Sequence, residues 1–511
     1  MNFHEISWTV ETPFPLLGGM QLLPALVGGV LFFVRSPRIA LGLGLAAVLS
    51  EIALGYELYQ YFKHLDHAGT TFHLVEQLSL GGPLVYHVGA DGLTVLFMLL
   101  TAFLSLMVLL YGAKVRQFTP LQRFLSIALF TESALMMQFA TLDLLWFSLT
   151  SAVQIPLIGF LLRSWATSTS AEAGAVTRYY QFMGLGLSLL LVATLLLGWN
   201  HASLMQGTWC FDLPSLAQTP APPWAQSILF YLLLYGLAIR IPLFPLHGWL
   251  PDVAEHGTVA AAMVLLIGLK SGIYGLLRYL FTLLPEGVWQ WHAYVVAFAT
   301  VGIFYAAVLA ILQRNVRRLL AYAVVSHTGV MTIGLFSLLP KGFQGCTLLA
   351  INFGLAISAI LLVVGSIYLR TRTLLLDNLG GLYDRMPLLA AAFLVATLAI
   401  LGMPMTPGFD AVHLLLEAAI DRFGTLVTIT AALGNVAAAS CLLWAFQRAF
   451  LGTPVSPTPT KTMQRERIVE KTMVLMMIVV QLSVGFYSGP GMKLIDGYTH
   501  ALAVPYQGRK P

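Results

Sequence analysis

A lysine lies near the middle of an apolar stretch that is long enough to cross a membrane. Lys270 occurs in the segment MVLLIGLKSGIYGLLRY, which carries no other charged residue before Arg278. Desolvation disfavours the charged form of an amine, so a lysine at this depth can load and release a proton near neutral pH. We predict that Lys270 titrates in this way. The alternative is that it pairs with an acidic side chain and only holds helices together.

Arg240 stands just before a proline-rich break in the stretch AIRIPLFPLHGWLPDVAEHG. Pro242 and Pro245 remove backbone N–H donors there and leave carbonyl groups that water or polar side chains can satisfy. Water at the break would make a buried cation tolerable. Because a guanidinium stays protonated, we expect Arg240 to act electrostatically. His247, in the same stretch, either carries protons or anchors the broken helix at the interface.

Two further ionisable residues occur inside apolar stretches. Glu132, in FTESALMMQFA, is the clearest buried carboxylate of the N-terminal half and a candidate counter-ion for Lys270. Glu51 and Asp91 lie nearer the ends of their stretches, where they are expected to meet the interface. His327, in AYAVVSHTGVM, is either a proton relay, because imidazole titrates near pH 7, or a structural histidine with satisfied partners.

A second break, GMPMTPGFD, contains Pro404 and Pro407. Asp410, His413 and Glu417 follow it, and their spacings of three and four residues place them on one face of a helix. We predict that this face is an exit route for protons.

The composition indicates lipid as the solvent for most of the surface. The chain has 511 residues, of which 58% are hydrophobic and 10% are charged, against about a quarter charged in soluble proteins. Cys210, Cys346 and Cys441 are far apart and lack CxxC spacing, which argues against a disulfide framework and against an iron–sulfur or zinc site. No glycine-rich nucleotide motif occurs. We therefore expect no cofactor, no metal, no nucleic-acid binding, and no catalytic redox or hydrolytic site in this chain.

Apolar stretches of about 20 residues can each cross a hydrocarbon core of roughly 30 Å as a helix. The fold class predicted is an all-α polytopic membrane protein with about fourteen spans. They are placed at 15–34, 38–61, 92–112, 121–140, 142–162, 179–199, 226–250, 258–282, 291–313, 319–339, 343–369, 386–420, 424–447 and 472–490.

The basic residues give the expected orientation. Most of them fall in the odd-numbered loops, and the even-numbered loops hold only Lys63, Arg278, Lys341 and Arg422. Positive charge stays cytoplasmic, so we expect a cell inner-membrane protein with both termini outside. The N-terminus shows no cleavable signal peptide.

The two broken spans, 226–250 and 386–420, are the seventh and twelfth, so they lie five positions apart in the series of spans. Paired breaks at matching positions indicate inverted repeats with a transport pathway between them, although proline is also common in membrane helices. The predicted organisation is helices 1–3 in residues 1–120, a first five-helix repeat in 121–282, a second, inverted repeat in 283–450, and a basic loop, a last helix and an outer tail in 451–511.

Five segments carry a family resemblance: RIPLFPLHGWLPDVAEHGTVAA, LLIGLKSGIYGLLRY, RRLLAYAVVSHTGV, YHVGADGL and LDNLGGLYDRMP. Together they resemble the antiporter-like membrane subunits of complex I, most closely the subunit 4 type, a family shared with Mrp antiporters and membrane hydrogenases. The resemblance covers roughly residues 80 to 450. It implies a fold of about fourteen helices with two inverted repeats and proton translocation along a central polar axis. Lys270 matches the family's central lysine, His327 matches a common histidine, and Arg240 stands where a lysine is usual.

Three positions depart from the family pattern. Ser151 replaces a glutamate that the family pairs with the lysine at the Arg240 position, and Phe353 replaces a histidine. Val412 stands at or near an expected charged residue, with Asp410 and His413 as imperfect substitutes. We expect Glu132, on the neighbouring helix, to replace the charge lost at Ser151.

Three functions are compatible with these residues. Because of the altered positions, the favoured one is a specialised paralogue that couples proton movement to a non-redox partner, as in inorganic-carbon (CO2/bicarbonate) uptake complexes with a zinc-containing, carbonic-anhydrase-like subunit. The first alternative is a proton-pumping subunit of a complex I-type quinone reductase or membrane hydrogenase, with redox chemistry in partner subunits. The second is a subunit of a Mrp-type Na+/H+ antiporter.

Overall fold

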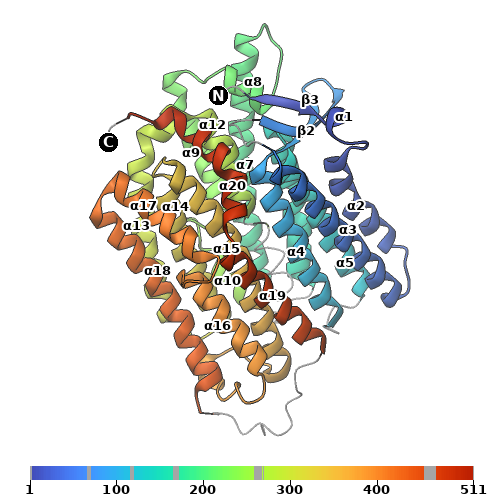
Figure 1. Ribbon diagram of the computed structural model, residues 1–511, viewed down its shortest axis with the longest axis vertical. Helices are drawn as coiled ribbons and strands as arrows, with labels where there is room; N and C mark the ends of the chain where they lie inside the picture. The colour runs from blue at the N-terminus through green and yellow to red at the C-terminus, as the bar shows by residue number, and fades with distance from the viewer. Residues whose placement is uncertain are drawn as a thin grey trace.

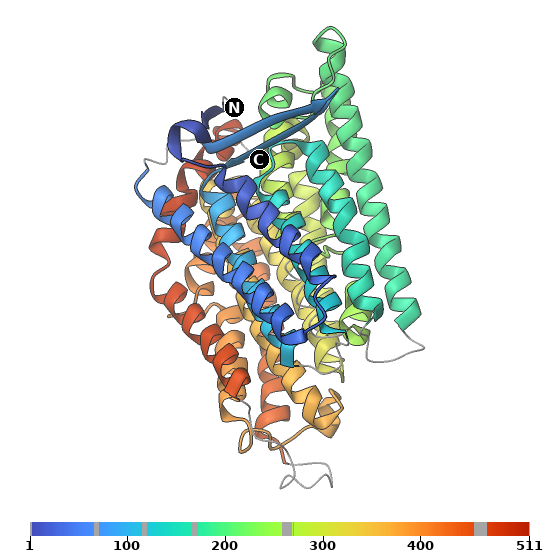
Figure 2. The same cartoon turned by 90° about the vertical axis from the view of Figure 1, so that its right-hand side faces the viewer.

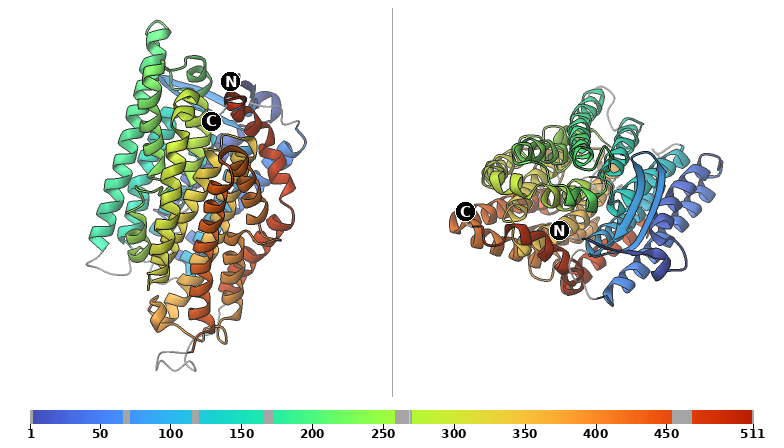
Figure 3. Two further views of the ribbon diagram at one scale, coloured as in Figure 1. Left: turned by 90° about the vertical axis from the view of Figure 1, so that its left-hand side faces the viewer. Right: turned by 90° about the horizontal axis from the view of Figure 1, so that it is seen from above.

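The structure is a computed structural model, and it describes residues 3–65, 71–114, 120–164, 172–257, 268, 270–453 and 468–509. These residues form a bundle of helices that run along the long axis of the molecule, with a small sheet at one end (Figure 1). Both termini lie at the end that carries the sheet (Figure 3, left).

The sheet consists of β1 (His4–Ser7), β2 (Thr71–Gly81) and β3 (Leu84–Ala90). β1 pairs with β2 in parallel and β2 pairs with β3 antiparallel. Figure 2 shows β2 and β3 lying across the ends of the N-terminal helices. The chain is predominantly helical as predicted, but the prediction omitted this sheet, although its strands contain many of the aromatic and β-branched residues that favour strands.

The first half of the bundle contains the first broken helix. Its elements are α1 (Trp8–Glu11), α2 (Leu16–Leu31), α3 (Pro37–Lys63), α4 (Gly92–Lys114), α5 (Leu121–Ala140), α6 (Leu144–Ser164), α7 (Glu172–Leu204), α8 (Leu213–Gln218), α9 (Pro223–Ala238), α10 (Leu250–His256), the π-helix η1 (Leu276–Leu280) and α12 (Phe281–Leu283). Pro242 and Pro245 lie in the irregular segment between α9 and α10, so the predicted break is present. Residues 258–267 and Leu269 of the predicted eighth span lie outside the described residues.

The second half contains the second broken helix. Its elements are α13 (Pro285–Ile311), α14 (Val316–Leu335), α15 (Pro340–Thr371), η2 (Leu376–Asn378), α16 (Pro387–Leu401), α17 (Gly408–Phe423), α18 (Thr425–Phe446), η3 (Gln447–Leu451), α19 (Ile468–Phe486), α20 (Gly489–Ala503) and η5 (Val504–Tyr506). Pro404 and Pro407 lie between α16 and α17, which confirms the second break. α20 was not predicted, because residues after 490 were interpreted as a tail.

Burial separates the central helices from the peripheral ones. Of the described residues, nine helices are long and apolar enough to cross a bilayer, and three shorter apolar helices accompany them. A helix occupies the place of each predicted span, the eighth only in part, while the total of fourteen and the inverted repeats stay predictions. The apolar segments of α15 and α14 are 94% and 89% buried, against 28% for α19. α14 and α15 are therefore central, and α19 presents most of its surface to lipid or to another subunit.

A buried ion pair lies near the sheet. The guanidinium of Arg278, which is fully buried, donates to Asp91 through Nη1 (2.7 Å) and Nη2 (2.8 Å). The ring of Tyr498 in α20 covers it, with the guanidinium carbon 4.8 Å from the ring centroid. The expectation that Asp91 meets the interface and that Arg278 belongs to a loop is therefore corrected: the two side chains pair in the interior and connect α4, η1 and α20.

We predict that Asp91→Asn destabilises the protein strongly, because it leaves Arg278 buried without a counter-charge. Removal of one partner of a buried ion pair costs about 3–5 kcal/mol. Thermal unfolding in detergent should show the loss. The control is Asp377→Asn, which removes a half-exposed carboxylate paired with Arg314 and Arg448 and should cost less than about 1 kcal/mol. Equal effects of the two substitutions would contradict the assigned role of the buried pair.

Candidate functional site

Lys270 lies in the centre of the bundle, beside the first break. Its side chain is buried, and no carboxylate of the described residues forms an ion pair with it. A cavity next to the amine has about 20 Å³ of space for the centre of a water-sized sphere, which is enough for a water molecule. Pro242 of the break and Thr328 of α14 line the same cavity. The amine therefore meets the broken helix and can contact water there.

Phe353 contacts both Lys270 and His327. The amine nitrogen of Lys270 lies 5.6 Å from the centroid of the Phe353 ring, and the His327 ring lies 4.5 Å from it on centroids. His327 is fully buried, and both of its ring nitrogens lack a hydrogen-bond partner in the structure. The phenyl ring, which cannot carry a proton, is thus a neighbour of both groups. His327 lies near Lys270, and whether it relays protons or is structural stays a prediction.

Arg240 is held by neutral oxygen atoms. Its Nη1 donates to Gln154 Oε1 (3.3 Å) and to Ser271 Oγ (3.0 Å), and Ser271 in turn donates to the carbonyl of Gly268 (2.7 Å). A second cavity of about 20 Å³, lined by Gln154, Tyr179 and Arg240, adjoins the guanidinium. Ser271 is the next residue after Lys270, so the hydrogen bond from Arg240 reaches the helix segment that carries Lys270.

Neither Ser151 nor Glu132 forms a hydrogen bond or ion pair with Arg240 in the described residues. Ser151 accepts a hydrogen bond from Gln138 (2.7 Å) and donates to the Phe147 carbonyl. Glu132 faces Glu51 of α3 rather than either cation. The expectation that Glu132 replaces the lost glutamate, or serves as counter-ion of Lys270, is therefore corrected. The amide of Gln154 occupies that place beside Arg240 without a charge.

His247 lies in an aromatic cage at the break. Its ring packs against Phe244, Tyr305 and Tyr322 at centroid distances of 5.8, 5.4 and 6.4 Å. The ring is buried, and Nδ1 has no hydrogen-bond partner among the residues that the structure describes. Of its two proposed roles, this packing favours the anchor.

Asp410, His413 and Glu417 share one face of α17, as the spacing predicted. Glu417 pairs with His413 (3.0 Å) and with Lys341 (2.7 Å), while Asp410 accepts from Ser488. The His413 side chain is 65% exposed. This row therefore follows the outside of the chain, where lipid or another subunit would cover it. Val412 packs against Gly402 at the second break and brings no charge there.

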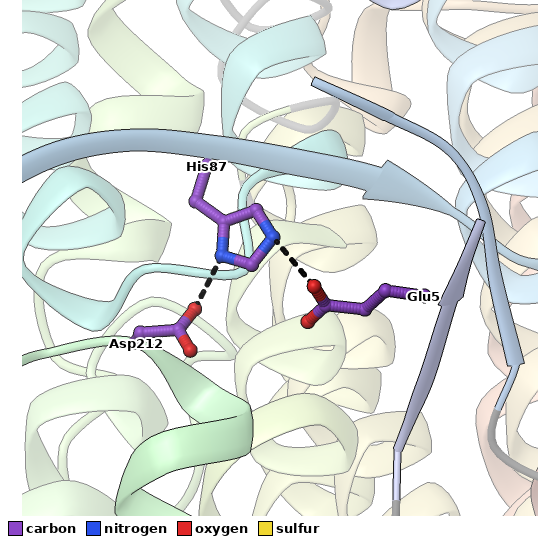
Figure 4. Close-up of side chains that lie close together, drawn as sticks. All are labelled: Glu5, His87 and Asp212. Atoms are coloured by element: carbon purple, nitrogen blue, oxygen red, sulfur yellow. Dashed lines mark hydrogen bonds and ion pairs between the residues drawn. The ribbon is translucent and has the colours of Figure 1, made fainter. Parts of the chain in front are cut away.

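A second polar cluster lies outside the helical core, at the end that carries the sheet. His87 of β3 stands between two carboxylates: Nδ1 is 2.5 Å from Asp212 Oδ1, and Nε2 is 3.5 Å from Glu5 Oε2 (Figure 4). In the described residues these three form the one group of side chains whose ligand atoms are close enough to hold a metal ion. Because each ring nitrogen faces a different carboxylate, the arrangement suits a doubly protonated imidazolium better than a metal ligand.

The charge of this cluster follows from its contacts. Burial alone would lower the pKa of His87, but the hydrogen bond to Asp212 and the negative charges of Asp212 and Glu5 outweigh burial and raise the pKa to about 9. Burial also raises the pKa of the neighbouring Asp143 to about 7, opposed by the backbone N–H of Trp146 and supported by the charge of Asp212. At neutral pH His87 is thus a cation that connects β1, β3 and the start of α8.

Three comparisons relate this arrangement to known proteins. The family model described as NADH:quinone oxidoreductase/Mrp antiporter, transmembrane, matches residues 140–437. NADH-quinone oxidoreductase subunit M of Rickettsia conorii is 30% identical over 414 residues, which are 80% of this chain and 81% of that protein. The chain belongs to this family. F420H2 dehydrogenase subunit M of Methanosarcina mazei is 30% identical over 448 residues, 86% and 88% of the two chains.

The solved structures extend the likeness to almost the whole chain. A chain of respiratory complex I from Thermus thermophilus superposes with a TM-score of 0.85 and 27% identity, over 96% of this chain and all of that one. The Mrp complex from Dietzia gives a TM-score of 0.82 at 19% identity, over 96% and 99%, which shows the same fold. Membership of the family, inferred from the motifs, is confirmed.

Sequence reasoning missed three members of the site: Gln154, Ser271 and Thr328. Gln154 follows Ser151 by three residues and so lies on the same side of α6. Gln154 could have been found by examining polar residues one helical turn from Ser151. Ser271 and Thr328 carry no comparable signal, because serine and threonine are common in membrane helices.

We predict that the stabilisation of the fold by His87 with Asp212 and Glu5 decreases at high pH. A raised folded-state pKa means that the stabilisation is fully present below the unfolded value of about 6.5 and is lost as pH rises through about 9. The difference in unfolding free energy between the wild type and His87→Gln should therefore fall by up to about 3 kcal/mol over that range. Thermal unfolding at several pH values measures it, and a difference that stays constant from pH 6 to pH 10 would refute the prediction.

Proposed function

We propose that this chain is a proton-conducting subunit of a multisubunit respiratory membrane complex, with the redox chemistry in partner subunits. The observation that carries the proposal is the Lys270 amine: it is buried, has no carboxylate partner among the described residues, and adjoins a cavity at the helix break. A group that loses its charge at low cost in such a place can pass a proton.

The relatives favour a redox partner over the carbon-uptake partner that the sequence alone placed first. Subunit M proteins of NADH- and F420H2-oxidising complexes match four-fifths or more of this chain. In this proposal the departures from the family pattern at Ser151, Phe353 and Val412 modify the proton path and do not abolish it. Arg240, held by Gln154 and Ser271, keeps a fixed positive charge near Lys270 and thereby favours release of the proton from the amine.

The path would begin at the broken helix. Water in the Lys270 cavity delivers a proton to the amine, with the hydroxyl of Thr328 as a second polar contact. Phe353 lines the Lys270 cavity and also contacts the His327 ring, so onward transfer towards His327 would need water beside this apolar ring. In this proposal the positive loops are cytoplasmic, and the end with both termini and the sheet faces outward.

The direct test replaces Lys270. In the purified complex, reconstituted in vesicles, Lys270→Met should reduce proton flux at least about tenfold, because the amine is gone. Lys270→Arg should reduce it similarly, because a guanidinium keeps its proton. Lys63→Met, which removes an exposed lysine at the end of α3, is the control and should leave flux unchanged.

Assembly is checked separately by copurification of the partner subunits with each variant. Normal flux in an assembled Lys270→Met complex would overturn the assigned role. The same preparation identifies the partner: a flavin or iron–sulfur protein supports the proposal, and a zinc protein with carbonic-anhydrase-type ligands contradicts its redox part.

A further inference from the structure

Two carboxyl groups face each other in the N-terminal part of the bundle. Glu51 is near the middle of α3 and Glu132 is near the middle of α5, and the side chains are 0% and 1% exposed. They interact with one another, and Ser105 of α4 lies beside Glu132. The expectation that Glu51 meets the interface at the end of its span is therefore corrected.

Within the described part of the chain, no cation balances this pair. None of the four carboxyl oxygens accepts a hydrogen bond from an N–H or O–H donor of the described residues. No lysine, arginine or histidine in the described part of the chain forms an ion pair with either group. Two ionised carboxylates at this depth would repel each other and would each carry the full cost of leaving water. A proton shared between them removes both penalties.

The pair is separate from the Lys270 site. α4 stands between them: on one side Leu100 contacts Gly354, close to the Lys270 side chain, and on the other Leu99 contacts Gly55 of α3. The charges on the two sides therefore do not neutralise each other by direct contact.

We propose that Glu51 and Glu132 form a second proton-binding site, a carboxyl pair that holds at least one proton between α3, α4 and α5. Only the use of this site, which is to hold a proton beside the conducting axis, rests on the proposed function. The binding itself follows from the burial and the missing partners. Ser105 is placed to donate to the pair when one carboxylate is ionised.

Infrared spectroscopy of the assembled complex tests the proposal. A protonated carboxyl group gives a C=O stretching band that an ionised one lacks. We expect the wild type to show such a band at neutral pH, and Glu51→Gln/Glu132→Gln to lose it. Glu57→Gln, which removes an exposed carboxylate from the same helix, is the matched control and should leave the band unchanged.

The amide substitutions preserve size and add no charge, so the double variant should assemble. Each single variant gives a second measurement: Glu51→Gln leaves Glu132 with an amide donor and should reduce the band at least twofold. The proposal is overturned if the wild type lacks the band or if the double variant retains it. The infrared test does not measure proton flux. A negative infrared result would therefore leave the proposed role of Lys270 intact, and normal flux in the Lys270→Met variant would leave the carboxyl-pair proposal intact.

Discussion

The rest of the structure depends on one constraint: an amine buried in a membrane protein without a counter-ion. Holding Lys270 charged at this depth costs roughly 3 kcal/mol or more, and no described carboxylate offsets that cost. The broken helix relieves part of it. Pro242 opens the backbone beside the amine and leaves room for a water molecule, and the Phe353 ring adds a weak cation–π contact. The amine thus lies where a water molecule can reach it, which is what the proposed proton path requires.

The same reasoning explains how Arg240 is tolerated after the loss of the family's glutamate. Gln154 and Ser271 satisfy two of its N–H donors with neutral oxygens, and an adjoining cavity admits water. With neutral partners the charge of the guanidinium is left uncompensated by direct contacts. A serine at position 151 and an arginine at position 240 are chemically consistent with each other, because neither side chain titrates near neutral pH.

The sequence alone predicted the features that depend on local pattern. The apolar spans, both proline breaks and the buried position of Lys270 follow from hydropathy and from proline chemistry, and the structure contains them. Features that depend on which helices touch were not predictable. Glu132 pairs with Glu51 rather than with Lys270 because α4 separates the two sites, and Asp91 reaches Arg278 across a long sequence separation. The sheet and α20 were missed because short amphipathic elements outside the spans have a weak signal.

Direct observation of the Lys270 amine tests the central claim. The chain contains eight lysines, so nitrogen-15 labelling of lysine gives a simple NMR spectrum in which the Lys270→Met variant identifies one signal. The account predicts that this signal changes from ammonium to amine within the neutral pH range, while the exposed lysines remain ammonium. A Lys270 signal that stays in a single protonation state throughout that range would contradict it.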